Sequence, residues 1–586
     1  MFASQLWPIL LAGLLTTRLA DAAEKSNGAT ALSAWIPEQA ALCLEIYQPG
    51  AILEPLLSSA FGERLASVPA YDRHRNSKQM QDLLGLTRLI EVTAQTNWQS
   101  AIRTITREGA AFALGAGNRR LLVLGGDDPS LLEKLHTFAR QLAVSEADKQ
   151  GQTDRVRSTD YAGVTGWTFN GQEAHALVGP RLLAASDAEV LRRALDLRSS
   201  GTGSLADRPV YQAARKAVGK DAAAMVFLDL EQLRQAPQFL NALDEQSHNP
   251  LAALLLAGYT GPIRSAPWLA LGVYVEGGTL AIRSFVGGDH ALEATPLFAR
   301  PPAGTNGQQP TLEIPRQIAA LSLYRDLAGF YAAKDTLFPQ RTSGLIFFEN
   351  MMGIFFTGRN LTDEVLAQTT PRVRLVAARQ EFDPAIGTPD PQLPSFAVVF
   401  ELRNPQDFGE VVEEAWQKAL GLVNFTRGQK ALPGLILDRT NYHGTTVTVA
   451  RYSAKEVPDR NHLDSRFNFR PTLALVHGHA ILSSTDQLAC DLVDALAQKP
   501  ASEAAAGPGA HSFLQLSGRE LGTILKANRF ALVEGNMLKD GKTQAEAEVT
   551  IDTLCSLAGW VDRASLQLGQ GPAGQTGELR LTFSKP

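Results

Sequence analysis

The chain has 586 residues, more than one compact hydrophobic core accommodates, so we expect two or more domains. Hydrophobic residues make up 45% of the sequence and charged residues 20%, which is an ordinary composition for a globular protein. The formal net charge of -5 is small for this length, so charge provides no reason to expect nucleic acid or an anionic membrane as a partner.

The N-terminus has the pattern of an export signal. An apolar run at residues 6–15, LWPILLAGLL, is shorter than the roughly 20 residues that span a bilayer. Ala-Asp-Ala at residues 20–22 supplies the small residues that signal peptidase requires, so we predict a signal peptide over 1–22 and a periplasmic or extracellular mature chain. The residues before the run contain no Lys or Arg, and the alternatives are an uncleaved anchor or a mitochondrial-type presequence. No later apolar run reaches spanning length, so we expect no transmembrane segment in the mature chain.

The rest of the chain contains two versions of one pattern. The matching phrases, in chain order, are IPEQAALCL from Ile36 and IPRQIAALSL from Ile314, Asp128-Pro129 and Asn404-Pro405, residues 174–197 and 473–496, and the strands that begin at Phe227 and Phe513. Because the matches keep the same order, we infer an internal duplication, with a first copy at 30–290 and a second at 313–586.

Each copy is predicted to combine strands joined by short hairpins with amphipathic helices. The clearest expected strands are 41–47, 111–114, 120–124, 268–276 and 279–286 in the first copy, and 319–324, 564–568 and 578–583 in the second. This pattern predicts an α+β fold, with two tandem copies of a mainly antiparallel sheet covered by amphipathic helices.

Polar residues mark the expected helix starts. Asp128 and Asn404 each precede a proline, so each is expected to place a capping oxygen at the start of its helix. In the phrase at 174–197 and its echo, Gly179 aligns with Gly478 and Asp187 with Asp486, which predicts a turn and a helix cap at equivalent places. Ser186-x-x-Glu189 also has capping-box spacing.

A linker lies between the two copies, and two longer loops distinguish the second copy from the first. Residues 291–312 include the Pro- and Gly-rich run RPPAGTNGQQP and are predicted to link the copies. The second copy carries longer loops, at 383–394 and 453–471. Such loops are where a binding function is added to a repeated scaffold, and unselected surface variation explains them equally well.

No short catalytic or cofactor motif stands in its required context. GxSxG, HExxH, CxxC and the EF-hand loop are absent, and the GxGxxG letters at 569–574 are expected to form a hairpin loop. We therefore expect no cofactor and, although enzymatic activity stays undecided, favour a protein that is not an enzyme. Cys43, Cys490 and Cys555 are too few for a disulfide framework, with a Cys490–Cys555 bridge as the alternative to buried thiols.

Two segments are weak candidates for ligand binding. His477 and His479 flank Gly478 at the spacing that places two strand residues on one face, where they could ligate a metal; exposed turn histidines are the favoured interpretation. The most apolar segment of the mature chain, 345–356, offers a surface for an apolar ligand, although a packing helix is favoured. The side chains of that surface are Phe347, Phe348, Met351, Met352, Phe355 and Phe356.

The signal pattern, the helix-opening Asn404-Pro-Gln-Asp-Phe and the Leu183–Asp187 phrase together resemble a family of exported bacterial proteins with a duplicated domain of unknown function. The resemblance implies export and duplication, and it supplies no catalytic residue. We expect a non-enzymatic binding or structural protein of the cell envelope or the secreted fraction, whose partner is an unidentified envelope protein or ligand. The alternatives are a hydrolase with a non-standard site that acts on cell-surface material, and a carrier of an apolar ligand.

Overall fold

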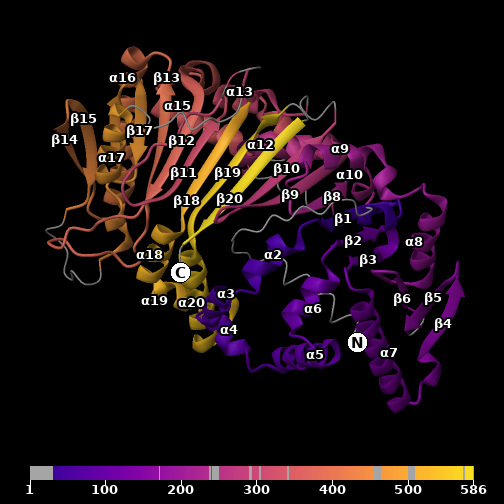
Figure 1. The fold of residues 1–586 in the computed structure, drawn as a ribbon. Helices are drawn as coiled ribbons and strands as arrows, with labels where there is room; N and C mark the ends of the chain where they lie inside the picture. Colours follow the sequence, from indigo (N-terminus) through magenta and orange to yellow (C-terminus); the bar gives the residue numbers. More distant parts are fainter. Residues whose placement is uncertain are drawn as a thin grey trace. The chain divides into compact units, whose positions relative to one another are not determined.

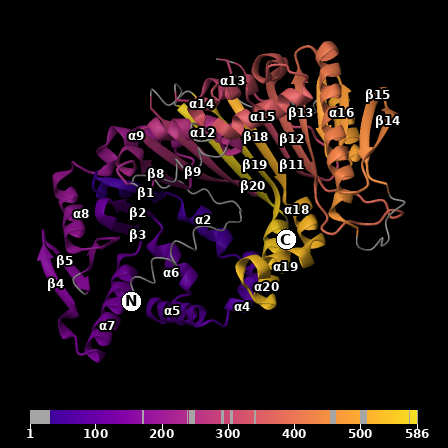
Figure 2. The ribbon, with the colours of Figure 1, turned by 180° about the vertical axis from the view of Figure 1, so that it is seen from behind.

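A computed structural model describes residues 31–169, 172–236, 239, 250–288, 294–302, 305, 307–338, 342–453, 463–498, 509–571 and 574–584. The predicted signal peptide at 1–22 lies outside these residues. The chain divides into two compact units, which are coloured by sequence in Figures 1 and 2. Unit 1 comprises Met1–Leu240, Ser265–Ala291 and Lys585–Pro586, and unit 2 comprises Asn241–Arg264 and Leu292–Ser584.

The described strands of unit 1 pair in the order β4-β5-β6-β7-β3-β2-β1-β8-β9-β10, and every pairing is antiparallel. Their bounds are β1 (Ala40–Ile46), β2 (Gly109–Gly115), β3 (Arg119–Gly125), β4 (Val156–Tyr161), β5 (Val164–Phe169), β6 (Glu173–Val178), β7 (Arg181–Ala185), β8 (Ala224–Asp229), β9 (Trp268–Glu276) and β10 (Thr279–Gly287).

The described strands of unit 2 pair in the order β14-β15-β16-β17-β13-β12-β11-β18-β19-β20, again antiparallel throughout. This order repeats that of unit 1 strand for strand. The bounds are β11 (Gln317–Tyr324), β12 (Thr369–Ala378), β13 (Ser395–Leu402), β14 (Ile436–Tyr442), β15 (Thr445–Arg451), β16 (Thr472–Val476), β17 (His479–Ser483), β18 (Ala510–Ser517), β19 (Val561–Gly571) and β20 (Gly574–Phe583).

Helices connect the strands in both units. Those of unit 1 are α2 (Pro49–Leu56), α3 (Ser59–Ala66), α4 (Pro69–His74), α5 (Lys78–Ala94), α6 (Trp98–Ile105), α7 (Pro129–Lys149), α8 (Ala188–Ser200), α9 (Pro209–Val218) and α10 (Leu230–Leu233). Those that belong mainly to unit 2 are α12 (Pro250–Ser265), α13 (Leu327–Ala332), α14 (Lys334–Leu337), α15 (Thr342–Phe355), α16 (Pro405–Gln429), α17 (Asp486–Ala497), α18 (Gly518–Ala527), α19 (Arg529–Asp540) and α20 (Gln544–Trp560). The predicted α+β class is confirmed.

One face of the unit 1 sheet is buried under α8 and α9. Alternate residues of β6, which are Ala174, Ala176 and Val178, face the same core as Leu191 and Leu195 of α8. The intervening residues of β6 point to the opposite face, because successive strand side chains alternate. Figure 1 shows α7 and α8 on opposite sides of β4, β5 and β6. Burial of a Leu or Val side chain contributes about 1.5–3 kcal/mol, so α8 holds its face of the sheet firmly.

The helix cap predicted at Asp187 in unit 1 is right, and the equivalent cap predicted at Asp486 in unit 2 is wrong. Asp187 accepts hydrogen bonds from the N–H groups of Glu189 and Val190, each at 3.0 Å, as expected for a cap. In unit 2, however, Thr485 is the cap, with its hydroxyl accepting from Leu488 N at 3.4 Å. Asp486 is the first helical residue, and its carboxylate pairs with Arg470 instead.

The turn before each helix explains this error. Gly179 is the first residue of the turn between β6 and β7 and has φ 59°. In the matching turn of unit 2 the first residue is His477 (φ 49°) and Gly478 (φ 76°) is the second. Two consecutive residues with positive φ define a different turn, so aligning glycine with glycine shifts the comparison by one residue. In the correct register Asp187 corresponds to Thr485.

Two smaller cap predictions are also wrong. Asn404 occupies the cap position of α16, but its side chain makes no cap hydrogen bond; its Nδ2 donates to Asp407 at 2.7 Å. Ser186 and Glu189 form no capping box, since Ser186 Oγ donates to Asp187 and Glu189 pairs with Arg193. Asp128, by contrast, caps α7 as predicted.

Other predictions concern the loops, the thiols and the membrane. The GxGxxG letters lie where β19 ends and β20 begins, as expected for a hairpin. Of the predicted linker, Gly307 and Gln308 hydrogen-bond to Ala510 O in unit 2. Cys490 and Cys555 are free thiols, so the alternative of a bridge between them is wrong. Within the described residues, no helix has both the length and the apolar composition needed to cross a membrane.

Candidate functional site

The two histidines proposed as metal ligands lie at the hairpin between β16 and β17. His477 is an exposed turn residue, and the Nδ1 of His479 lies 2.9 Å from the carbonyl oxygen of His477. No group of three His, Cys, Asp or Glu side chains suited to a metal ion occurs within the residues that the structure describes. The local geometry therefore supplies two imidazoles with no third ligand.

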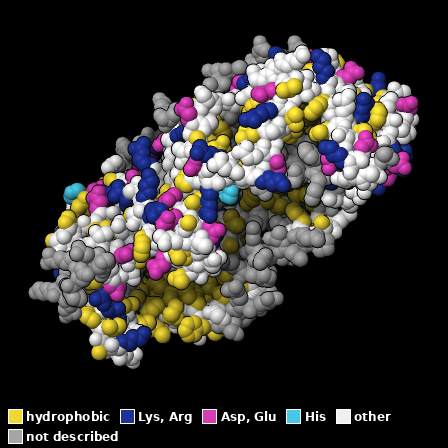
Figure 3. Space-filling model, turned by 90° about the horizontal axis from the view of Figure 1, so that it is seen from below, with side chains coloured by type: hydrophobic (Ala, Val, Ile, Leu, Met, Phe, Trp, Pro, Cys, Tyr) yellow, Lys and Arg dark blue, Asp and Glu magenta, His cyan; other side chains and the backbone are white. Residues whose placement is uncertain are grey.

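The apolar segment proposed as a ligand surface forms most of α15. Met352 and Phe356 pack against a core that contains Phe408 and Leu361, whereas Phe347 points outward with 70% of its surface exposed. Exposed apolar side chains also appear in yellow among the charged ones in Figure 3. The six predicted side chains thus divide between the core and the surface, and do not line one cavity together.

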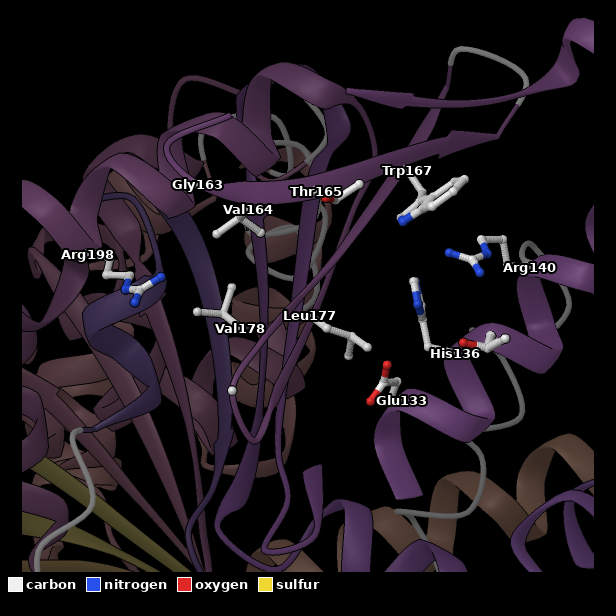
Figure 4. Close-up of a pocket in the computed structure, with 12 residues that line it drawn as sticks. Glu133, His136, Arg140, Gly163, Val164, Thr165, Trp167, Leu177, Val178 and Arg198 are labelled. Atoms are coloured by element: carbon white, nitrogen blue, oxygen red, sulfur yellow. The ribbon is translucent and has the colours of Figure 1, made fainter. Parts of the chain in front are cut away.

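A pocket that the sequence did not indicate lies in unit 1, between α7 and the ends of β5 and β6. Its volume is about 400 Å³. It is lined by Glu133, His136, Thr137, Arg140, Gly163, Val164, Thr165, Trp167, Leu177, Val178, Gly179 and Arg198. Figure 4 shows His136, Arg140 and Trp167 facing one space, with Arg198 on the opposite side of the strands in that view.

One stripe of α7 forms the first wall. Glu133, His136, Thr137 and Arg140 are spaced three, four and seven residues apart, which places them on one face of a helix. Their neighbours Leu131 and Leu132 are buried, so the helix is anchored beside this polar stripe by its apolar residues. The anchoring holds the four polar side chains toward the sheet.

The second wall exists because two paired strands separate. β5 and β6 are paired from Gly166 with Ala176 to Phe169 with Glu173. The same register would place Thr165 opposite Leu177 and Val164 opposite Val178, and neither of these pairs is joined. The strand ends therefore diverge, and the pocket occupies the space between them.

His136 is the most deeply buried polar group of the pocket. Only 8% of its surface is exposed, and its Nε2 is buried with no hydrogen-bond partner among the described residues. Its ring centre lies 6.4 Å from that of His175, which in turn contacts Phe169. Burial, and secondly the charge of Arg140, lower the pKa of His136; burial lowers the pKa of His175 to about 4. Both rings are therefore neutral at pH 7.

Two arginines carry the positive charge of the pocket. The guanidinium carbon of Arg140 lies 4.0 Å from the centre of the Trp167 ring, a stacked cation–π arrangement. No carboxylate or other hydrogen-bond acceptor pairs with Arg140 or Arg198 in the described part of the chain. Glu133 contributes a negative charge, and Thr165 donates to Asp160 at 2.7 Å. The polar groups can therefore bind a ligand by charge and hydrogen bonds.

Unit 2 has the same strand divergence but no equivalent polar wall. Pairing of β15 with β16 also stops short, at Val447 with Ala474. Counted from the proline that opens each helix, His136 corresponds to Val412 and Arg140 to Trp416. Val412 packs with Leu475 in an apolar cluster, and a Cβ on Gly409 would lie 3.3 Å from that leucine. Apolar side chains thus fill in unit 2 the space that forms the pocket in unit 1.

Sequence reasoning missed His136, Arg140 and Trp167. Apolar residues at helical spacing dominate this helix, and His136 lies among them, one turn beyond Leu132; they are Leu131, Leu132, Leu135, Phe138 and Leu142. The signal that could have indicated it is the polar repeat at 133, 136, 137 and 140. The corresponding residues in the second unit are apolar, Gly or acidic, so the two units differ most at this stripe.

Residues 94–256, which include the whole pocket, match the family described as "Protein of unknown function (DUF3352)". No curated protein matches the chain. Solved structures described as "Structure of crystal form I of TP0453" and "Structure of crystal form IV of TP0453" are similar at 10% and 11% identity. They cover 45% and 44% of this chain and 81% of their own, each with a TM-score of 0.23, and carry no argument about fold or function.

Proposed function

We propose that this chain, in which residues 94–256 match a domain of unknown function, is an exported, non-enzymatic protein that binds a small ligand in the unit 1 pocket. The observation that carries the proposal is the pocket of about 400 Å³, on which His136, Arg140 and Trp167 converge. Within its lining, the Nε2 of His136 has no hydrogen-bond partner among the described residues, and a polar atom buried without a partner is unfavourable by about 1–3 kcal/mol. The volume lies in the range of small-molecule sites.

Export, a periplasmic or extracellular location and the internal duplication belong to the same proposal. The signal pattern at residues 1–22 supports export, and the repeated strand order of the two units supports duplication. Under duplication, the pocket is a feature that one copy gained or the other lost. A binding role in one copy and a structural role in the other follow from this difference.

A hydrolase with a non-standard site is the second candidate, because polar side chains converge on a pocket in unit 1 and not at the equivalent place in unit 2. A nucleophile would need a base within hydrogen-bond reach. No hydrogen bond joins His136 to Thr137 or Thr165 among the described residues, and Thr165 donates to Asp160. These contacts favour binding over turnover. The third candidate, a carrier of an apolar ligand, is supported by the exposed Phe347 on α15.

The pocket is tested by filling it. Thr165→Trp places a large side chain at the mouth of the pocket, and Thr159→Trp adds the same side chain at an exposed position of β4 outside the lining. A set of small anionic, neutral and cationic compounds is screened by ligand-observed NMR against the wild type and both variants. We expect compounds that bind the wild type and Thr159→Trp but not Thr165→Trp. Equal binding to both variants, or no binding of any compound, contradicts the proposal.

A further inference from the structure

We infer that the pocket takes a small organic anion, whose charged oxygens lie between Arg140 and His136. The inference rests on the proposed function, since it names the ligand class of the same pocket. It follows from the donors that face the pocket, the charges that border it, and the equivalent place in unit 2.

Arg140 is held against Trp167 at one side of the pocket. Its guanidinium carbon lies over the Trp167 ring, 4.0 Å from the ring centre. A guanidinium attracted to an aromatic face still has N–H groups with which to bind a ligand. No carboxylate pairs with Arg140 among the described residues, so within this part of the chain its donors have no acceptor. A planar guanidinium of this kind matches the oxygens of a carboxylate or phosphate.

His136 adds a second group beside the first. It lies one helical turn before Arg140 on the same face of α7, and both line the pocket. The ring is neutral at pH 7 because burial and Arg140 lower its pKa, so one of its nitrogens carries a proton. Its Nε2 has no partner among the described residues, so a small rotation of the ring that opens this nitrogen to the pocket supplies a donor beside Arg140. A metal cation is disfavoured there by the charge of Arg140.

Glu133 and Asp160, the acidic residues at the border of the pocket, limit where the ligand can place its negative charge. Glu133 is two helical turns from Arg140, about 10 Å along the helix axis. Asp160 accepts the hydroxyl of Thr165 at the strand side of the pocket. The ligand therefore has its charge at the Arg140 end and an uncharged body toward Glu133 and Leu177. This favours an organic anion over inorganic phosphate, which would also leave most of the roughly 400 Å³ volume empty.

The equivalent place in unit 2 indicates how many ligands each chain binds. Val412 and Trp416 stand where unit 1 has His136 and Arg140, and Gly409 packs closely against Leu475. That place lacks both the histidine and the arginine. One anion is therefore expected for each chain.

The experiment measures binding to the full mature chain by isothermal titration calorimetry. The probes are citrate, glycerol 3-phosphate, inorganic phosphate, glycerol and choline, which separate carboxylate from phosphate and anion from neutral and cationic compounds. We expect citrate or glycerol 3-phosphate to bind once per chain and more tightly than inorganic phosphate. Arg140→Gln is expected to weaken that binding at least tenfold, and Arg140→Lys to weaken it less.

Lys134→Gln is the matched control, because it removes one positive charge from an exposed position of the same helix outside the pocket. Its affinity should stay within twofold of the wild type, and the thermal midpoint of each variant checks that it is folded. Equal losses in Arg140→Gln and Lys134→Gln overturn the inference. Binding of neutral or cationic compounds alone also overturns it while leaving the proposed function standing, whereas no binding by any compound class contradicts both.

Discussion

His511 of β18 is a histidine that folding keeps uncharged. Its ring is fully buried, with Nδ1 2.9 Å from Ser512 Oγ and Nε2 2.6 Å from the side-chain amide of Gln575. The buried guanidinium of Arg325 donates to the same Ser512 hydroxyl at 3.0 Å. Burial and secondly this positive charge lower the pKa of His511 to about 3. A proton on this ring would be placed beside a cation with no carboxylate between them.

This histidine makes stability depend on pH. In the unfolded chain the pKa of histidine is about 6.5, so between this value and about 3 the unfolded state binds more protons than the folded state. The contribution of His511 to the free energy of unfolding is therefore fully present above pH 6.5. It decreases as the pH is lowered, by up to about 1.4 kcal/mol per pH unit. Urea unfolding at pH 7, 6 and 5 measures this slope. We expect His511→Gln to reduce it, with the exposed His74→Gln as control; parallel curves for the wild type and His511→Gln would exclude this role.

At the scale of elements, the start of α17 provides a test of the corrected cap. Thr485→Ala removes the oxygen that accepts from Leu488 N and is expected to lower the free energy of unfolding by about 1 kcal/mol. Asp486→Ala removes only a partly exposed ion pair with Arg470, for which we expect about 0.5 kcal/mol or less. Chemical denaturation of both variants measures the difference, and Thr485→Ser, which keeps the oxygen, should stay near the wild type. The reverse order of losses would restore Asp486 as the cap.

Local patterns predicted the elements well. The strands near 41–47, 268–276 and 279–286 and the helix after Asp128 follow from alternation, helical spacing and capping, all of which act over a few residues. Strand order could not be predicted in the same way, because the pairing of β1 with β8 depends on contacts between residues far apart in the sequence. The pocket was missed for a related reason: it arises where the pairing of β5 with β6 stops, and no local pattern encodes that end point.

At the scale of the whole molecule, the proposed export makes a definite prediction about the chain's N-terminus. Protein recovered from the periplasm or the medium of its native cell should begin at Ala23, because signal peptidase cleaves after the small residues at 20–22. N-terminal sequencing or intact mass measures this directly. Changing Ala20 and Ala22 together to Lys is expected to leave an uncleaved precursor. Recovery of wild-type protein that retains residues 1–22, in the cytoplasmic fraction, would rule out export by this route.

The position of β1 in its sheet also sets the order in which unit 1 can fold. β1 lies between β2 and β8, so Ile46 pairs on one side with Ala110 and on the other with Ala224. The centre of the sheet is completed only when β8 has joined, and closing so long a segment makes folding slow compared with that of proteins built from local contacts. We therefore expect the newly synthesised chain to remain unfolded for longer than a helical bundle of the same size. Under the proposed export, in which the chain crosses a membrane unfolded, such a delay would keep it competent for transport.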